Sequence, residues 1–301
     1  MTTPSKARPR LMLLFTTTGY EAREFVQAAQ QLGVETVLGS DRCHVLDDPW
    51  QDGALPLRFE KPEEAAQHIL DYARAQPLDA ILPIGDTPVL TAALATQSLG
   101  FQHNAPSAAA ASRNKFVMRQ LLRDAGLRVP WFACFPMQAD PYVLQHEVPY
   151  PCVVKPLALS ASRGVMRANT PEEFVTAFWR LRALLGTPEI RMKQDEVYEA
   201  ILVEGFIPGF EVALEGLLTA GRLEVLALFD KPDPLDGPFF EETLYITPSR
   251  LQPAVQEAIV HCTEQATRAL GLVHGPLHAE LRINQDGPWI LEVAARAIGG
   301  L

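Results

Sequence analysis

The sequence predicts an α/β protein whose N-terminal domain contains a parallel β-sheet, and two observations support this fold class. Short apolar runs alternate with helical segments over the first hundred residues, an order that predicts parallel strands joined by helical crossovers. The chain of 301 residues is 48% hydrophobic, so it can bury the cores of two or three compact units.

The N-terminal elements are expected in strict alternation of strand and helix. Residues 11–15 are continuously apolar, which is typical of a buried strand. Gly33 is a stop signal for a helix over residues 21–31. The turn at 16–19 holds a single glycine, so it is not a dinucleotide-binding fingerprint. The next elements are expected at 34–38 (strand), 62–75 (helix), 80–83 (strand) and 88–99 (helix).

Gly85 and Asp86 follow the strand predicted at 80–83. Open α/β sheets bind ligands beyond the carboxyl ends of their strands, so Asp86 is a candidate ligand contact. The alternative is that Asp86 caps the helix that begins near Pro88.

The second part of the chain begins after residues 105–112, which are rich in alanine and are predicted to be a connection between units. Arg113 opens a helix that Gly126 ends. The helix expected at 172–185 carries apolar residues three and four positions apart, which is typical of packing on a core. The other expected elements are strands at 151–156, 200–204, 212–218 and 223–229, and a helix at 253–270 capped by Gly271.

The composition argues against several classes of protein. Binding to nucleic acid or to a membrane surface needs a basic face, whereas the net charge is −10. No apolar stretch is long enough for a signal peptide or a membrane span. The four cysteines are scattered without metal-ligand spacing, as expected of thiols in a reducing cytoplasm: Cys43, Cys134, Cys152 and Cys262. We therefore expect a cytoplasmic protein.

A lysine and a flexible loop suggest phosphate binding. Lys155 ends an apolar strand, and the small residues 159–165 follow before the next strand. A loop of this kind can fold over phosphates and offer backbone N–H groups and hydroxyls. The alternative is an ordinary surface hairpin loop.

Two acids bracket a turn that could bind a heterocycle. Glu204 and Glu211 flank a Gly/Pro turn with apolar walls. Backbone groups of such a turn can hold a flat ring, while a carboxylate accepts hydrogen bonds from ribose hydroxyls. The alternative is a strand–loop–strand with two solvated acids.

A hairpin near the end of the chain carries two further acids. Strict alternation over 278–283 predicts a strand with one wet face (His278, Glu280, Arg282) and one dry face. A three-residue loop at 285–287 would set Glu280 opposite Glu292 on the second strand. Two carboxylates at that distance repel each other unless a divalent cation such as Mg²⁺ lies between them. The alternative is a solvated hairpin with its charges splayed apart.

The order of these features resembles the ATP-grasp superfamily, most closely its carbamoyl-phosphate-synthase-like and L-amino-acid ligase branch. The matching features are Lys115, the strand ending at Lys155, the loop at 160–164, the segment from Glu204 to Glu211, Glu280, and Glu292 with Arg296 four residues later. The resemblance covers nearly the whole chain. It implies a Rossmann-like pre-ATP-grasp domain over 1–110, followed by a two-subdomain α+β ATP-grasp fold. The small subdomain, with a linker helix and phosphate loop, would span 111–199 and the large one 200–301.

The resemblance also implies a role for each matching residue. Lys115 and Lys155 match lysines that contact ATP phosphates, and Glu280 and Glu292 match ligands of Mg²⁺ or Mn²⁺. Arg296 matches the arginine that neutralises the transferring phosphate or the substrate carboxylate. The implied nucleotide contacts are Ser160, Ser162, Arg163 and Gly164 in the closing loop, Glu204, Phe206 and Ile207 in the adenine hinge, and Glu211 at the ribose. Candidates on the substrate side are His278, as a catalytic residue or an ordinary strand histidine, with Lys231, Glu242 and His274.

The activity implied is ATP-dependent ligation of a small carboxylate to an amine, with an amino acid as a candidate substrate and a homodimer as a candidate assembly. The alternatives are a purine-pathway or biotin-carboxylase-like ligase, and an ATP-binding module without turnover. Two departures bear on these choices. Ala294 stands where many relatives have an asparagine that completes the metal site. The sequence stops at Leu301, where relatives usually continue, so the C-terminal part of the fold is expected to be absent.

Overall fold

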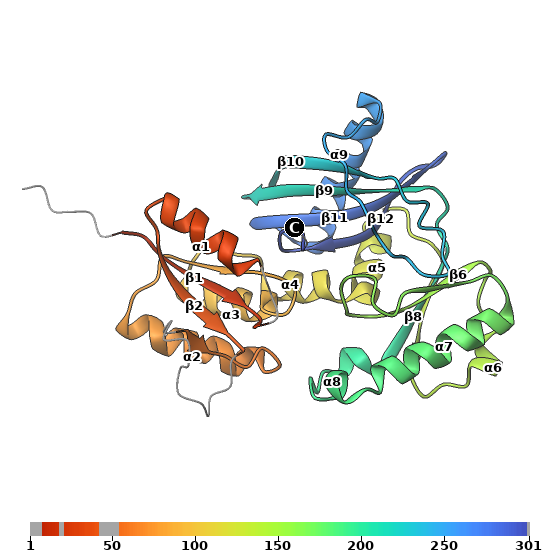
Figure 1. Ribbon diagram of the computed structural model, residues 1–301, viewed down its shortest axis with the longest axis horizontal. Helices are drawn as coiled ribbons and strands as arrows, with labels where there is room; N and C mark the ends of the chain where they lie inside the picture. Colours follow the sequence, from red (N-terminus) through yellow and green to blue (C-terminus); the bar gives the residue numbers. More distant parts are fainter. Residues whose placement is uncertain (1–7, 18–20, 42–53, 300–301) are drawn as a thin grey trace, which may run out of the picture. The chain divides into compact units, whose positions relative to one another are not determined.

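The computed structural model of the chain describes residues 8–17, 21–41 and 54–299. The chain divides into two compact units, one of residues 1–109 and 295–301 and the other of residues 110–294 (Figure 1). The sequence does not predict that residues 295–301 belong to the first unit. The subdivision of the later part at residue 199 stays a prediction.

The first unit is built on a parallel sheet with the strand order β3-β2-β1-β4, which confirms the predicted sheet type. Its central strand β1 buries Met12, Leu13 and Leu14 completely, as expected of a strand covered on both faces. The strands are β1 (Arg10–Phe15), β2 (Glu35–Ser40), β3 (Leu55–Pro56) and β4 (Ala80–Pro83), and the helices are α1 (Ala22–Gln31), α2 (Pro62–Ala75) and α3 (Val89–Leu99).

One predicted connection is a helix. Residues 105–112 are predicted to connect two units, and the boundary between the units falls between Ala109 and Ala110. Pro106–Arg113 form the helix α4 there. Alanine has the highest helix propensity, and proline suits the first helical position, so the local sequence accounts for this result. The predicted connection between the two units is therefore helical.

The second unit begins with α5 (Lys115–Asp124), where the Asn114 side chain accepts hydrogen bonds from the backbone N–H groups of Phe116 and Val117. An antiparallel sheet in the order β5-β8-β6-β7 follows. Its strands are β5 (Phe132–Pro136), β6 (Cys152–Pro156), β7 (Met166–Ala168) and β8 (Ala200–Gly205), and its helical segments are α6 (Pro141–Leu144), α7 (Pro171–Leu185), α8 (Pro188–Arg191) and a 3₁₀ turn at Glu196–Tyr198.

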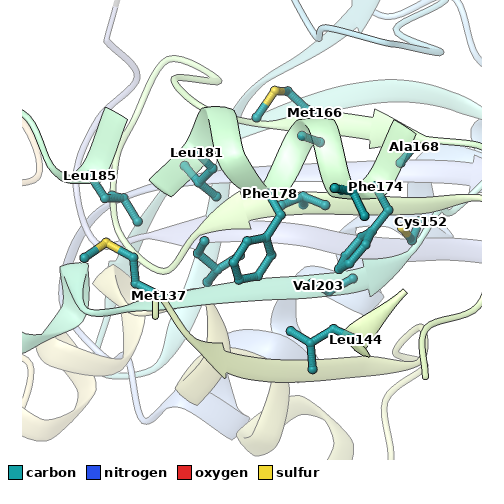
Figure 2. Close-up of a cluster of buried hydrophobic side chains, with 14 of the residues drawn as sticks. Met137, Leu144, Cys152, Met166, Ala168, Phe174, Phe178, Leu181, Leu185 and Val203 are labelled. Carbon is teal, nitrogen blue, oxygen red and sulfur yellow. The ribbon is translucent and has the colours of Figure 1, made fainter. Parts of the chain in front are cut away.

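Helix α7 closes the core of this sheet. Phe174, Phe178 and Leu181 are fully buried, and Figure 2 shows them projecting from the helix toward Val203 of β8. This contact confirms that the apolar stripe of the helix faces a core. The Thr170 side chain accepts a hydrogen bond from the backbone N–H of Glu173 and so caps the helix.

A second antiparallel sheet completes the unit, in the order β10-β9-β11-β12, and α9 packs on it. Leu277, Ala279 and Leu281 of β11 are fully buried on one face. The elements are β9 (Phe210–Thr219), β10 (Arg222–Lys231), α9 (Pro253–Leu270), β11 (Gly275–Asn284) and β12 (Gly287–Ala294).

The hairpin of β11 and β12 has a shorter loop than predicted, yet Glu280 still lies opposite Glu292. Asn284 pairs with Gly287, so the loop has two residues and not three. In a regular ladder this loop would set Glu280 opposite Leu291. The register instead shifts by one, because Leu281 pairs with Ile290 and Glu280 with Glu292. A β-bulge at Leu291 thus produces the expected opposition of the two glutamates.

No helix within 8–17, 21–41 or 54–299 has both the length and the apolar character needed to cross a bilayer. Cys134, Cys152 and Cys262 are free thiols, and Cys43 lies outside the described residues.

Candidate functional site

The opposed glutamates of the hairpin each bind a lysine. The Glu292 carboxylate lies 3.0 Å from Lys115 Nζ, and the Glu280 carboxylate lies 3.1 Å from Lys231 Nζ. Both glutamate side chains are 23% exposed, so they are neither splayed into solvent nor sealed in the core. The alternative of a solvated hairpin edge is therefore wrong.

Lys231, at the end of β10, joins three acids. Its Nζ lies 2.6 Å from Glu242, 3.1 Å from Glu280 and 3.6 Å from Glu211. Burial alone would lower the pKa of Lys231, but these carboxylates outweigh it and raise the pKa. The lysine is therefore charged, and its three acids belong to three different predicted subsites: the ribose (Glu211), the metal (Glu280) and the substrate side (Glu242). Tyr245 donates a hydrogen bond to the second carboxylate oxygen of Glu242.

His278 lies between two carboxylates on the charged face of the sheet. Its Nδ1 is 2.5 Å from Glu215 and its Nε2 is 3.2 Å from Glu280. Burial disfavours the charged ring, but hydrogen bonds to both acids raise the pKa of His278 to about 9. The same contacts, together with Lys231, hold the pKa of Glu280 well below its usual range although burial opposes them. A general base needs a neutral ring, so the geometry favours a fixed cation at this position.

The predicted wet face of β11 is largely dry. His278 and Arg282 are both buried, at 4% and 2% exposure. The prediction of a solvated face is wrong because pairing between charges, and not water, satisfies these side chains.

Lys155 and Glu204 form a buried ion pair near the start of the predicted hinge. Lys155 Nζ lies 2.5 Å from the Glu204 carboxylate, and Arg119 Nε lies 2.6 Å from the same group. Burial alone would raise the pKa of Glu204, but the two cations lower it to about 2. Burial also lowers the pKa of Lys155 against the pull of Glu204. The alternative of solvated acids at Glu204 and Glu211 is wrong, since both are buried.

Arg282 links the two ends of the hinge turn. Its guanidinium donates to the Glu211 carboxylate at 2.8 Å, to the Ile207 carbonyl at 2.8 Å and to the Leu235 carbonyl. Burial raises the pKa of Glu211 despite Lys231 and Arg282. The ring of Phe206 has Arg282 at 4.7 Å and Arg167 at 4.0 Å from its centroid. The hinge is thus held by charged side chains from several strands.

The predicted phosphate loop lies between β6 and β7. Lys115 Nζ donates to the Leu159 carbonyl at the start of the loop, at 3.1 Å. Arg163 forms a two-pronged ion pair with Glu189, at 2.8 and 2.9 Å. Ser160 is exposed, while Ser162 and Gly164 are partly exposed, with positive φ angles of 52° and 80°. The phosphate-binding role of this loop stays a prediction.

Arg296 belongs to the first unit, where it pairs with Asp86. Its Nε and Nη2 donate to the two carboxylate oxygens at 2.9 and 3.1 Å. Asp86 does not cap α3, whose N-cap position is Pro88 and which has no side-chain cap. The N-cap interpretation of Asp86 is therefore wrong.

Comparison with known proteins identifies the family. Residues 148–301 match the ATP-grasp domain, and residues 26–103 match the ATP-grasp N-terminal domain. The chain belongs to the ATP-grasp family. Among solved structures, this ATP-grasp chain is similar to L-amino acid ligase from Bacillus licheniformis, with 29% identity and a TM-score of 0.81. The similarity covers 98% of this chain and 70% of that one.

Two curated relatives are similar to most of this ATP-grasp chain. Alanine–anticapsin ligase of Bacillus subtilis strain 168 is 27% identical over 79% of this ATP-grasp chain and 53% of its own length. The ATP-grasp enzyme fsqD of Aspergillus fumigatus is 25% identical over 87% of this chain and 46% of its own. The chain thus spans about half the length of these relatives.

The opposed carboxylates of this ATP-grasp chain have the chemistry that suits a divalent cation. ATP-grasp ligases in general use ATP and a divalent metal ion. Within the described ranges no group of three or more His, Cys, Asp or Glu side chains could hold a metal alone. Mg²⁺ commonly binds one or two carboxylates together with substrate phosphates and water. Glu280 and Glu292 supply two such oxygen donors, opposed across one hairpin.

Sequence reasoning missed three residues of this network: Arg119, Glu215 and, as a structural link, Arg282. One signal for Arg119 was available, because it lies four residues after Lys115 and therefore on the same helix face. No local pattern marks its partners, which lie 85 and 171 residues further along the chain.

Proposed function

We propose that this protein is an ATP-dependent carboxylate–amine ligase that works through an acyl phosphate and takes an amino acid as a substrate. One observation carries the proposal: Glu280 and Glu292 oppose each other, and each is bound to a lysine. The names of the relatives, L-amino acid ligase and alanine–anticapsin ligase, support the substrate class.

In this proposal the charged network binds ATP. Lys115 and Lys155 contact the phosphates together with the loop residues Ser160, Ser162, Arg163 and Gly164. The turn of Glu204, Phe206 and Ile207 binds adenine, and Glu211 accepts the ribose hydroxyls. Glu280 and Glu292 hold Mg²⁺ or Mn²⁺, which supplies positive charge next to the phosphate oxygens when bound.

The reaction needs no nucleophile from the protein. A carboxylate oxygen of the substrate attacks the γ-phosphorus of ATP, giving an acyl phosphate and ADP. The amine then attacks the acyl carbon, loses a proton and expels inorganic phosphate. Arg296 neutralises charge on the transferring phosphoryl group or the substrate carboxylate. His278 acts as an imidazolium that fixes Glu280, consistent with its raised pKa.

Phosphate release in the presence of amino-acid pairs, ATP and Mg²⁺ tests the proposal. We expect release that depends on the added amino acids in the wild type and falls to background in Glu292→Gln. Glu224→Gln serves as the matched control, because Glu224 is an exposed acid on β10 of the same sheet.

Other results would contradict the proposal in identifiable ways. Release driven by bicarbonate or a ribosyl amine, and not by amino acids, would assign the protein to the purine-pathway or biotin-carboxylase-like ligases. ATP binding without release over the whole panel of acids and amines would indicate a nucleotide-binding module. A homodimer and a cytoplasmic location remain predictions, and light scattering of the purified protein tests the first.

A further inference from the structure

Arg119 is an almost completely enclosed charged side chain, with 1% exposure. It projects from α5 and makes four hydrogen bonds. Two go to the Glu204 carboxylate, at 2.6 and 3.4 Å, and two go to backbone carbonyls of β12. Nη1 donates to Ile290 at 2.7 Å, and Nη2 donates to Leu291 at 3.1 Å.

These carbonyls belong to the β-bulge that determines the position of Glu292. Leu291 has no cross-strand partner, since its neighbours pair with Glu280 and Leu281. A bulge interrupts the ladder and leaves backbone groups without strand partners, and β12 is also an edge strand. A buried carbonyl without a donor destabilises the conformation that exposes it. Arg119 donates to two carbonyls of this bulge at once.

The helix face of α5 that carries Arg119 also binds Glu292, the residue of β12 that follows Leu291. Lys115 lies one turn before Arg119 on α5 and binds Glu292. Helix α5 therefore contacts three successive residues of β12, through two cations. The planar guanidinium suits this task, because lysine has a single nitrogen and cannot serve an acid and two carbonyls in one plane.

We propose that Arg119 is a positioning residue that holds the β12 bulge and so places the metal ligand Glu292 opposite Glu280. Through Glu204 it ties this placement to the predicted adenine hinge. The inference rests on the proposed function, in which Glu280 and Glu292 bind the metal. Arg119 touches neither substrate nor metal in this role.

Binding of Mn²⁺ in the presence of ADP tests the inference, with free Mn²⁺ followed by electron paramagnetic resonance. Loss of residues that orient metal ligands typically lowers metal affinity by about 10- to 100-fold. We expect a loss of this size in Arg119→Lys of the 301-residue chain. The lysine keeps a cation beside Glu204, so ADP affinity without metal should stay within about threefold of the wild type. Arg123→Met is the control, because Arg123 is an exposed arginine on the same helix.

Deletion of Leu291 separates positioning from general stabilisation. Removing this residue restores a regular ladder in which Glu292 is still opposite Glu280. Metal affinity should then no longer depend on Arg119. We expect Arg119→Lys in the deletion background to bind Mn²⁺ as tightly as the deletion variant alone.

Each outcome decides the inference. A folded Arg119→Lys with wild-type Mn²⁺ affinity overturns it, as does an equal loss in both backgrounds. If Arg119→Lys folds only when Leu291 is deleted, the folded state needs Arg119 only when the bulge is present, and this result supports the inference. If neither form folds, Arg119 stabilises the core regardless of the bulge, and the inference is wrong. A wild-type chain that binds neither Mn²⁺ nor ADP would instead refute the proposed function itself.

Discussion

At the residue scale, the site consists of buried charges that hold one another. One sheet carries the cations Lys231, Arg282 and His278, which neutralise four acids. Three of these acids lie on the same sheet and the fourth lies in the loop after β10: Glu211, Glu215, Glu280 and Glu242. Buried ion pairs contribute little net stability, but removal of one partner leaves a costly unpaired charge. Such pairs are therefore better evidence of a defined geometry than of a stable fold. The short contacts to His278 make its protonation the most direct test of this description.

The protonation of His278 should make the stability of the protein depend on pH. Its folded pKa of about 9 exceeds the ordinary value of 6.5, so the proton stabilises the folded state. The contribution is complete below about pH 6.5 and is lost as the pH rises through about 9. The rise in pKa from 6.5 to about 9 corresponds to at most about 3 to 4 kcal/mol in the free energy of unfolding. The lowered pKa of Glu280 reflects the same hydrogen bonds, so it is not a separate contribution to the free energy of unfolding.

Urea unfolding at pH 6.5 and pH 9.5 measures this difference. Wild type should lose stability between the two pH values, and His278→Gln should lose clearly less. His261→Gln, which alters an exposed histidine on α9, should follow the wild type. An NMR titration that gives His278 a pKa at or below 6.5 would show that the ring is neutral and the fixed-cation description is wrong.

At the element scale, the hinge turn depends on the close approach of its backbone to strand β11. Gly209 has a φ of 121°, and a Cβ at this position would lie 2.1 Å from the Ile283 carbonyl oxygen on β11. Only glycine fits both conditions. The turn between β8 and β9 therefore packs directly on the strand that carries Glu280 and Arg282.

Gly209→Ala should displace the hinge. We expect a loss of more than about 2 kcal/mol in the free energy of unfolding, since backbone strain and a backbone clash act together. ADP affinity should also fall by at least about tenfold if the turn binds adenine. Urea unfolding and calorimetric titration with ADP measure the two effects.

Gly221→Ala is the matched control. Gly221 has a φ of 78° in the turn between β9 and β10, and its added Cβ would meet only Val273, at 3.9 Å. It should lose about 1 kcal/mol from the left-handed backbone alone and bind ADP normally. Equal losses of ADP affinity in both variants would contradict a specific role for the hinge turn.

At the scale of the whole molecule, the chain returns to its first unit after the second is complete. Residues 295–301 follow β12 in sequence but belong to the unit that contains the parallel sheet. The pair of Arg296 with Asp86, 210 residues apart, is part of this return. The predicted catalytic arginine is thus oriented by an acid that follows the carboxyl end of β4.

Arg296→Ala should lower kcat while leaving ATP affinity within about threefold of the wild type. An interaction that forms mainly in the transition state behaves in this way, and loss of one such donor costs on the order of 100-fold. Asp86→Asn should lower kcat by less, and the double variant should match Arg296→Ala because the two residues act together. Steady-state phosphate release measures kcat, and titration with ATP measures the affinity for ATP.

Arg10→Ala controls for the loss of any arginine from this unit. Arg10 forms an ion pair with Glu35 at 2.6 Å on β1 and β2, and such surface pairs contribute little. Its kcat should remain that of the wild type. If ATP affinity in Arg296→Ala falls more than tenfold with kcat unchanged, the proposed role of Arg296 is wrong.

The sequence by itself determined the elements with strong local signals. Helices α2 and α9 and strand β4 begin and end where periodicity, Pro62, Pro253 and Gly271 predict. The parallel sheet also followed from local pattern. The opposition of Glu280 to Glu292 was predicted from a three-residue loop and arises instead from a two-residue loop and a bulge. Two short strands, β3 and β5, escaped prediction because neither shows clear alternation.

Only the tertiary structure decided how the charges are partnered. Which acid binds Lys155 or Lys231, and why Arg282 is buried, depends on contacts between strands that lie far apart in sequence. The bulge at Leu291 is a similar case, since its carbonyls are satisfied by an arginine from a helix 171 residues earlier. Local propensity determines strands and helices, but burial and hydrogen bonding in the folded chain select the partners.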